Sequence, residues 1–214
     1  MKSLPNQLVQ AITKELSAIS KANLKKASTN LSERYSKGVF INSQHHRLAY
    51  IATRLPATYA VLYQVLQRIH PRLSDIQSFM DLGSGVGSSL WAASEILPNL
   101  TQSALYEKDT YLIQLGQRLT RNQVNLKEAN WFHNDIAKVN SFSSHDLTLI
   151  SYVLNELTPD DQAKLIKKAY SATDQLLILI EPGTPKGFGH ILKARQDLIE
   201  LGANIVAPCP HLHP

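Results

Sequence analysis

Short apolar segments alternate with helical segments from residue 76 onward, and this alternation limits the fold of the 214-residue chain more than any other feature. Apolar segments of about four to eight residues predict strands, and the amphipathic segments between them predict helices. The expected strands are residues 76–81, 103–106, 129–133, 146–153, 176–180 and 204–207, and the expected helices are 88–97, 111–122, 159–172 and 187–201. We therefore expect an α/β fold whose mostly parallel sheet is covered on both faces.

A glycine-rich turn joins the first of these strands to the first helix. It reads Asp81-Leu82-Gly83-Ser84-Gly85-Val86-Gly87. Glycines permit a tight turn and a close approach of the backbone to a ligand, and the following helix offers free N–H groups. A dinucleotide-binding turn reads G-x-G-x-x-G, whereas here the third glycine comes one residue earlier. The spacing Asp-x-Gly-x-Gly-x-Gly is typical of S-adenosylmethionine (SAM) sites, where an acid at the strand end suits the ligand's ammonium group.

Two more acids follow the next two expected strands. Glu107 lies 20 residues beyond Gly87, where a carboxylate can accept hydrogen bonds from both ribose hydroxyls. Because NAD sites use the same arrangement, Glu107 predicts a ribose and does not distinguish the cofactor. Asp135 follows the third strand, where SAM folds commonly meet the adenine amino group. The alternatives are that these acids, Asp81 included, cap helix N-termini, or that the fold has lost its cofactor.

The segment after the fourth expected strand does not identify a catalytic base. Amino-methylating enzymes have Asn/Asp-Pro-Pro-aromatic at this place and cytosine methylases have Pro-Cys, whereas residues 152–157 read Tyr-Val-Leu-Asn-Glu-Leu. Asn155 and Glu156 are candidates for contact with a substrate. Their alternative role is to cap the helix that begins near Pro159.

Positive charge is concentrated in the first third of the chain. Residues 1–75 contain 11 Lys/Arg and three acids, a net charge of +8, whereas residues 76–214 carry −3. Apolar residues recur at helical spacing over 4–27 and 47–69, with a connector between them and Pro56 at a helix start or kink. We therefore divide the chain into a basic helical extension, residues 1–75, and a SAM-binding domain, residues 76–214.

Segregated positive charge indicates a polyanionic partner such as nucleic acid, and a solubilising helix face is the alternative. Four arginines recur through the extension and are candidate contacts to RNA phosphates. They are Arg47, Arg54, Arg68 and Arg72.

Cysteine and apolar content exclude several classes of protein. Cys209 is the only cysteine, so the chain has no internal disulfide and cannot by itself complete a thiolate-held cluster, and a reducing compartment is indicated. The longest apolar runs fall far short of the ~20 residues that cross a membrane, so we expect no membrane partner. The N-terminus lacks the apolar block of a secretory signal, while a mitochondrial presequence stays open because no acid precedes Glu15.

Six segments are more distinctive than the spacing of the glycines. They are Leu31–Tyr35, Ala49–Ala60, Asp81–Gly87, Ser151–Leu157, Ile180–Phe188 and Val206–His211. Together they resemble the methyltransferase-like family associated with the ribosomal small subunit in bacteria and mitochondria, the Rsm type, over about residues 30–214. The resemblance implies a class I SAM-binding domain with a helical extension and a role in small-subunit assembly beside ribosomal RNA. It also implies an iron–sulfur cluster or metal in the C-terminal part, and a location in the bacterial cytoplasm or the mitochondrial matrix.

The C-terminal segment departs from that family. There, Ala-Pro-Cys-Pro-His begins a series of cysteine ligands, and the next would stand at position 215, one beyond Pro214. We therefore expect Cys209 to be the remnant of a metal site and a free, semi-buried thiol. The usual seven-stranded SAM sheet finishes with a hairpin, so the last strand is expected to be missing and strand 176–180 to have an unpaired edge.

Two functions fit these features. The first is a SAM-dependent methyltransferase-like enzyme that acts on or beside ribosomal RNA. The second is a non-catalytic assembly factor that uses the SAM fold as a binding platform. An NAD(P)-dependent enzyme is a third possibility, which the early third glycine disfavours.

Overall fold

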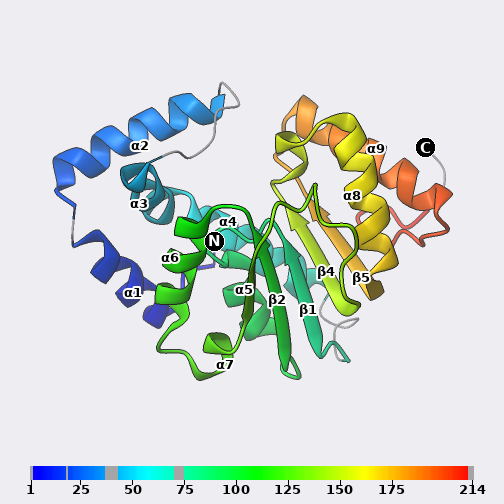
Figure 1. Cartoon of the computed structure of the whole chain (residues 1–214), viewed down its shortest axis with the longest axis horizontal. Coiled ribbons are helices and arrows are strands. Elements are labelled where there is room, and N and C mark those ends of the chain that lie inside the picture. Colours follow the sequence, from blue (N-terminus) through cyan, green and yellow to red (C-terminus); the bar gives the residue numbers. More distant parts are fainter. Residues whose placement is uncertain (1, 18, 37–42, 70–74, 212–214) are drawn as a thin grey trace.

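The computed structural model describes residues 2–17, 19–36, 43–69 and 75–211. At its centre is a parallel sheet of five strands in the order β3-β2-β1-β4-β5 (Figure 1). The strands are β1 (Ser78–Leu82), β2 (Gln102–Glu107), β3 (Asn130–His133), β4 (His145–Ser151) and β5 (Thr173–Ile180). The strand order reverses between β1 and β4, and in open α/β sheets ligands bind beyond the carboxyl ends of the strands at such a point.

Helices connect the strands and precede the sheet. The four that precede it are α1 (Asn6–Leu16), α2 (Lys21–Ser36), α3 (Gln44–Thr53) and α4 (Leu55–Ile69). Those that follow β1 are α5 (Ser88–Ile96), α6 (Thr110–Thr120), α7 (Val124–Lys127), α8 (Pro159–Ser171) and α9 (Pro185–Glu200), with the short 3₁₀ turn η2 at Leu154–Glu156.

Helices cover both faces of the sheet, as the alternation predicts. Successive side chains of a strand point to opposite faces, so Phe79 and Met80 of β1 enter different apolar clusters. Phe79 packs with residues of α4, α5 and α6, whereas Met80 packs with residues of α8 and α9. The α/β fold with a covered parallel sheet is therefore confirmed.

Three of the four N-terminal helices share a core with the sheet. Leu8 of α1, Ile51 of α3 and Leu62 of α4 are buried in the same cluster as Phe79. Ion pairs join Lys2 to Glu95 of α5 and Glu15 to Arg118 of α6, each at 2.9 Å. These helices therefore form part of the cover of the sheet. The division of the chain into two domains at residue 75 remains a prediction.

Helix α2 is placed differently. It lies on the outer side of α3 in Figure 1, and its apolar contacts join Ala27 and Leu31 to Ala49 of α3. The side chains of Lys21, Lys25 and Lys26 on α2 are exposed. The basic character of the extension is therefore displayed most openly on this outlying helix.

Several boundaries differ from those expected. Helix α2 continues to Ser36 through part of the expected connector, because Ala27 and Leu31, one helical turn apart, pack against α3. Residues 204–207 form no strand, and a proline follows them at position 208 that cannot donate a sheet hydrogen bond. Pro56 is the second residue of α4, which confirms a helix start at this proline.

Strand β5 lies at one edge of the sheet. Only Ile178 among its residues is buried. Within the described part of the chain no strand pairs with its outer edge, as was expected for this segment.

A helix that crosses a membrane must be both long and apolar. None of the helices among the described residues is long and apolar enough to cross a membrane.

A comparison of two helical glycines tests the packing of α6. At Gly116 a Cβ atom would lie 2.4 Å from Cη2 of Trp131, whereas at Gly189 of α9 it would meet nothing within 4 Å. We expect Gly116→Ala to lower the free energy of unfolding by about 1–3 kcal/mol through overpacking. Gly189→Ala should raise it by up to about 1 kcal/mol, because alanine favours a helix. Urea denaturation followed by circular dichroism measures both, and equal effects would contradict the packing.

Candidate functional site

The glycine turn has a backbone conformation that only glycine adopts readily. Gly83, Gly85 and Gly87 have φ angles of 89°, 56° and 78°. The N–H groups of Gly83 and Ser84 donate to the carbonyl of Tyr106 in β2 at 2.9 and 3.0 Å. The turn is therefore held against the carboxyl end of the neighbouring strand, at the point where the strand order reverses.

The three glycines differ in the space beside them. A Cβ at Gly83 would lie 2.3 Å from Cγ2 of Val153, and a Cβ at Gly87 would lie 3.0 Å from Cη2 of Trp131. At Gly85 the nearest atom within 4 Å would be the Tyr50 hydroxyl oxygen, at 3.8 Å. Gly83 and Gly87 thus serve internal packing, whereas the backbone of Gly85 is open to the approach of a ligand.

Asp81 is buried at the end of β1 with only part of its hydrogen-bonding capacity used. The Ser89 hydroxyl donates to its Oδ2, while its Oδ1 has no hydrogen-bond partner among the described residues. Burial raises the pKa of Asp81 to about 7; the Ser89 hydrogen bond opposes this rise, and the charge of Glu107 adds to it. The hydroxyls of Ser84 and Ser88 are likewise buried without a partner in this part of the chain. Since buried polar atoms are normally paired, these three oxygens fit a polar ligand such as the amino-acid end of SAM.

Glu107 is buried at the end of β2 and binds the glycine turn. Its Oε2 accepts the N–H of Gly85 at 2.9 Å, and its Oε1 accepts the N–H of Asp109 at 2.8 Å. Burial raises the pKa of Glu107, and these backbone hydrogen bonds oppose the rise. A carboxylate has about four acceptor positions, so two remain for ribose hydroxyls.

Neither Asp81 nor Glu107 caps a helix, which was the alternative role for these acids. The N-cap of α5 is Gly87, and the N-cap of α6 is Asp109, whose carboxylate accepts the N–H of Tyr111 at 2.9 Å. Asp135 accepts the N–H of Ala137 at 3.2 Å in a turn that no helix follows. Its role at an adenine remains a prediction.

The segment after β4 forms a tight turn close to the site. Tyr152 has a φ of 60°, a conformation that is uncommon for a residue other than glycine. The Asn155 amide donates to the Tyr152 carbonyl at 3.4 Å, and Glu156 pairs with Lys108 at 2.8 Å. Thr158 caps α8, so Asn155 and Glu156 do not have that alternative role. Their contact with a substrate remains a prediction.

Sequence reasoning missed Glu181 as part of this turn. Its carboxylate is buried and accepts the N–H of Leu154 at 2.9 Å, which ties the end of β5 to η2. The available signal was the presence of two distinctive segments, 151–157 and 180–188, which meet at this hydrogen bond.

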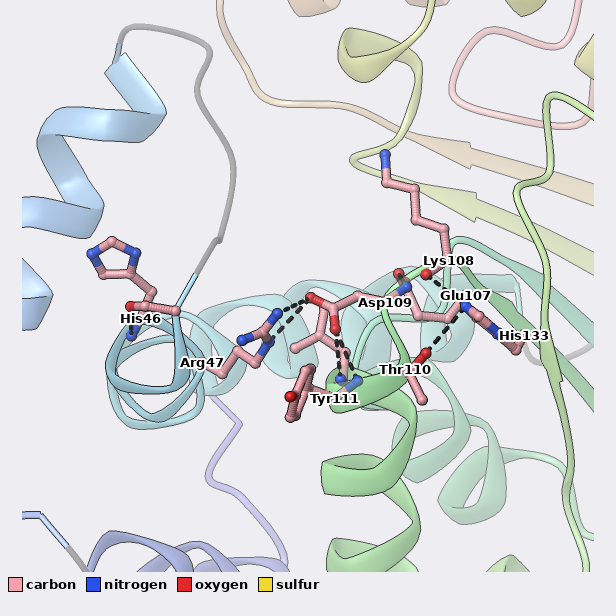
Figure 2. Close-up of polar contacts among 10 residues, drawn as sticks. His46, Arg47, Glu107, Lys108, Asp109, Thr110, Tyr111 and His133 are labelled. Atoms are coloured by element: carbon pink, nitrogen blue, oxygen red, sulfur yellow. Dashed lines mark hydrogen bonds and ion pairs between the residues drawn. The ribbon is translucent and has the colours of Figure 1, made fainter.

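The four candidate arginines have different surroundings. The guanidinium of Arg47 donates to Asp109 Oδ2 through Nη2 at 2.7 Å and through Nε at 3.0 Å, as Figure 2 shows. Arg54 donates to the Ser32 hydroxyl at 3.2 Å, and Arg68 is exposed on α4. Arg72 lies outside the described residues. Their contacts with RNA remain predictions, and Arg47 has a partner inside the protein.

The described residues do not fit the metal site that the resemblance implies. Cys209 is exposed and not semi-buried, because it lies between two prolines in a segment that joins no strand. In the described ranges no group of three or more His, Cys, Asp and Glu side chains could hold a metal ion. His213 lies outside the described residues.

The reversed strand order, the glycine turn and the acid that ends β2 define a class I SAM-dependent methyltransferase fold. Solved structures agree with this class. The chain is similar to SAM-bound CalS10, an amino pentose methyltransferase from Micromonospora echinaspora, with a TM-score of 0.54 and 16% identity over 69% of this chain and 60% of that one. It is also similar to the N-methyltransferase NodS from Bradyrhizobium japonicum, with a TM-score of 0.52 and 15% identity over 66% and 80% of the two chains. At these identities the likeness shows the fold alone.

The chain belongs to the family described as mitochondrial small ribosomal subunit Rsm22, which matches residues 44–213. It is 27% identical to the human ribosome assembly protein METTL17, mitochondrial, over 77% of this chain and 40% of that protein. It is also 27% identical to the Rsm22-cox11 tandem protein 2, mitochondrial, of Schizosaccharomyces pombe, over 77% and 24% of the two chains. The chain thus spans less than half the length of these curated relatives.

The raised pKa of Asp81 predicts how stability depends on pH. The unfolded residue loses its proton near pH 3.8, whereas the folded one keeps it to about pH 7. Its contribution to stability is therefore complete below pH 3.8 and is lost as the pH rises to about 7. We expect Asp81→Asn to remove this loss, so that the variant gains up to about 4 kcal/mol relative to the wild type between pH 4 and 7.5. Urea denaturation across this range is the measurement, and Asp75→Asn at an exposed position is the control. A parallel pH dependence in wild type and Asp81→Asn would contradict the assignment.

Proposed function

We propose that this chain binds SAM and acts in the assembly of the small ribosomal subunit, on or beside ribosomal RNA. The observation that carries the cofactor half is the open backbone at Gly85, beside the three buried oxygens of Asp81, Ser84 and Ser88 that lack partners among the described residues. Membership of the Rsm22 family supports the ribosomal half. The named relatives are mitochondrial, which favours the mitochondrial matrix over a bacterial cytoplasm as the location.

Each acid has a role in this proposal. Asp81 holds the ammonium group of SAM, Glu107 accepts the ribose hydroxyls, and Asp135 meets the adenine amino group. SAM, when bound, supplies an activated methyl group. The chain's own contribution is then mostly placement, since holding an acceptor in line with the methyl group supplies several kcal/mol of the barrier. Asn155 and Glu156, at the turn after β4, are the residues that we place toward the acceptor.

Binding of S-adenosylhomocysteine (SAH) tests the cofactor half. We expect calorimetry to detect SAH binding to the full chain, and Gly85→Val to weaken it at least tenfold. The valine side chain enters the open space at Gly85 and is strained at a φ of 56°. The control is Gly183→Val, at an exposed position with nothing within 4 Å.

The wild-type affinity for SAH should also fall as the pH drops below about 7, because protonated Asp81 no longer attracts an ammonium group.

Failure of the wild type to bind SAH would overturn the cofactor half. Equal losses at Gly85 and Gly183 would show that the glycine turn is not the site of binding.

RNA binding by the helical extension is the second part of the proposal. Deleting residues 1–75 would remove apolar side chains from the main core, so charge substitutions give the cleaner test. We expect the triple change of Lys21, Lys25 and Lys26 to Gln to reduce the slope of log affinity against log salt by about 2–3. Filter binding to a small-subunit ribosomal RNA fragment measures the slope.

The matched control for this prediction changes three exposed lysines on the other side of the sheet, in α8 and α9. These are Lys164, Lys167 and Lys186, each replaced by Gln. An equal fall in slope for both triple variants would contradict a binding surface on α2.

A non-catalytic assembly factor is the second candidate function. Residues 152–157 lack the tetrad of amino-methylating enzymes, and the side chains of Asn155 and Glu156 already have partners in the protein. The Gly85→Val variant separates the two functions in cells. If small-subunit association and maturation survive the loss of SAH binding, methylation is not the main role.

A further inference from the structure

Helix α3 of the N-terminal extension contacts the loop that follows β2. The Arg47 guanidinium donates two hydrogen bonds to Asp109 Oδ2 and lies over the Tyr111 ring, 4.6 Å from its centre (Figure 2). The side chains of Arg47 and Asp109 are only 14% and 19% exposed. An ion pair so shielded from solvent, with two hydrogen bonds, is held more firmly than an exposed surface pair.

Asp109 connects this ion pair to the site. Its other carboxylate oxygen, Oδ1, accepts the N–H of Tyr111 at 2.9 Å and so caps α6. Its own backbone N–H donates to Glu107 Oε1 at 2.8 Å. Since Glu107 Oε2 accepts the N–H of Gly85, an unbroken series of hydrogen bonds runs from α3 to the glycine turn.

The same helix reaches the glycine turn at a second point. Tyr50 lies three residues after Arg47, on the same side of the helix. Its hydroxyl oxygen is 3.8 Å from the position of a Cβ at Gly85, the glycine with open space beside it. Helix α3 therefore borders the site through Tyr50 and orients one of its acids through Arg47.

We infer that Arg47 is a positioning residue for Glu107, acting through Asp109, and that α3 links cofactor occupancy to the docking of the helical extension. The inference rests on the proposed binding of SAM at the glycine turn. A ligand that requires Glu107 in its present position favours the docked α3. By thermodynamic reciprocity, a partner that holds or displaces α3 changes the affinity for the cofactor by the same factor.

The outlying helix α2 is the element through which a partner would act on α3. Its apolar contacts join Ala27 and Leu31 to Ala49 and Tyr50 of α3. A polyanion bound to the lysines of α2 therefore acts on the same helix that orients Glu107. The sequence predicts a phosphate contact for Arg47. We instead place Arg47 between the lysines of α2 and the glycine turn.

The test compares SAH affinity in a double-mutant cycle on the full chain. Arg47→Met removes the guanidinium, and Asp109→Asn removes the charge but keeps a capping oxygen and the backbone N–H. We expect each variant to weaken SAH binding about 3–10-fold and the double variant to be no weaker than either, with partial recovery in Arg47→Lys. The control is Arg118→Met, which breaks the other arginine–acid pair between the extension and α6 and should leave SAH affinity unchanged.

Hydrogen exchange on the wild type provides a measurement that needs no variant to fold. SAH should slow amide exchange in α3 and leave α9 unchanged. If the wild type binds SAH but the Arg47 and Asp109 variants bind it equally well, or α3 exchange is unaffected, this inference is overturned and the proposed function stands. If the wild type does not bind SAH, the cofactor half of the proposed function fails and this inference fails with it.

Discussion

The backbone between β1 and α5 passes so close to its neighbours that a side chain would clash with Val153 at Gly83 and crowd Trp131 at Gly87. Val153, after β4, closes one side of the turn, and Trp131 of β3 closes the other. Trp131 also lies against Gly116, which sets how closely α6 approaches the sheet. Through these contacts the carboxyl end of β1, the segment after β4, Trp131 of β3 and the middle of α6 meet around one loop. Apolar close packing thus fixes the course of the turn, and the hydrogen bonds of Glu107 then hold that acid against it.

Much of the architecture could be predicted because apolar periodicity reports burial directly. The parallel sheet, its strands β1 to β4 and the start of α4 at Pro56 follow from local pattern. Helix α2 and the segment 204–207 were misjudged because both depend on what lies beside them. Ala27 alone does not indicate a buried helix face, and its burial depends on packing against Ala49 of α3. An apolar run such as 204–207 forms a strand only if a neighbouring strand pairs with it.

The site could be predicted less fully than the fold. Asp81, the glycines and Glu107 follow from spacing, because a turn between a strand and a helix has few ways to expose its backbone. Arg47 read as a free basic side chain, since its partner Asp109 is 62 residues away and nothing local indicates the pair. Glu181 was missed for the same reason, as its hydrogen bond to Leu154 spans 27 residues. Contacts between distant segments escape a reading by periodicity.

The ion pairs of α1 also bear on how the chain acquires its structure. Glu15 finds its partner Arg118 103 residues later, and Lys2 finds Glu95 on α5. Neither contact can form before its partner has been synthesised, and bringing such distant segments together costs chain entropy. During synthesis α1 therefore cannot complete these contacts until α5 and α6 have been made. The two ion pairs therefore join segments that are made at different times, and the contact between α1 and this face of the sheet depends on both.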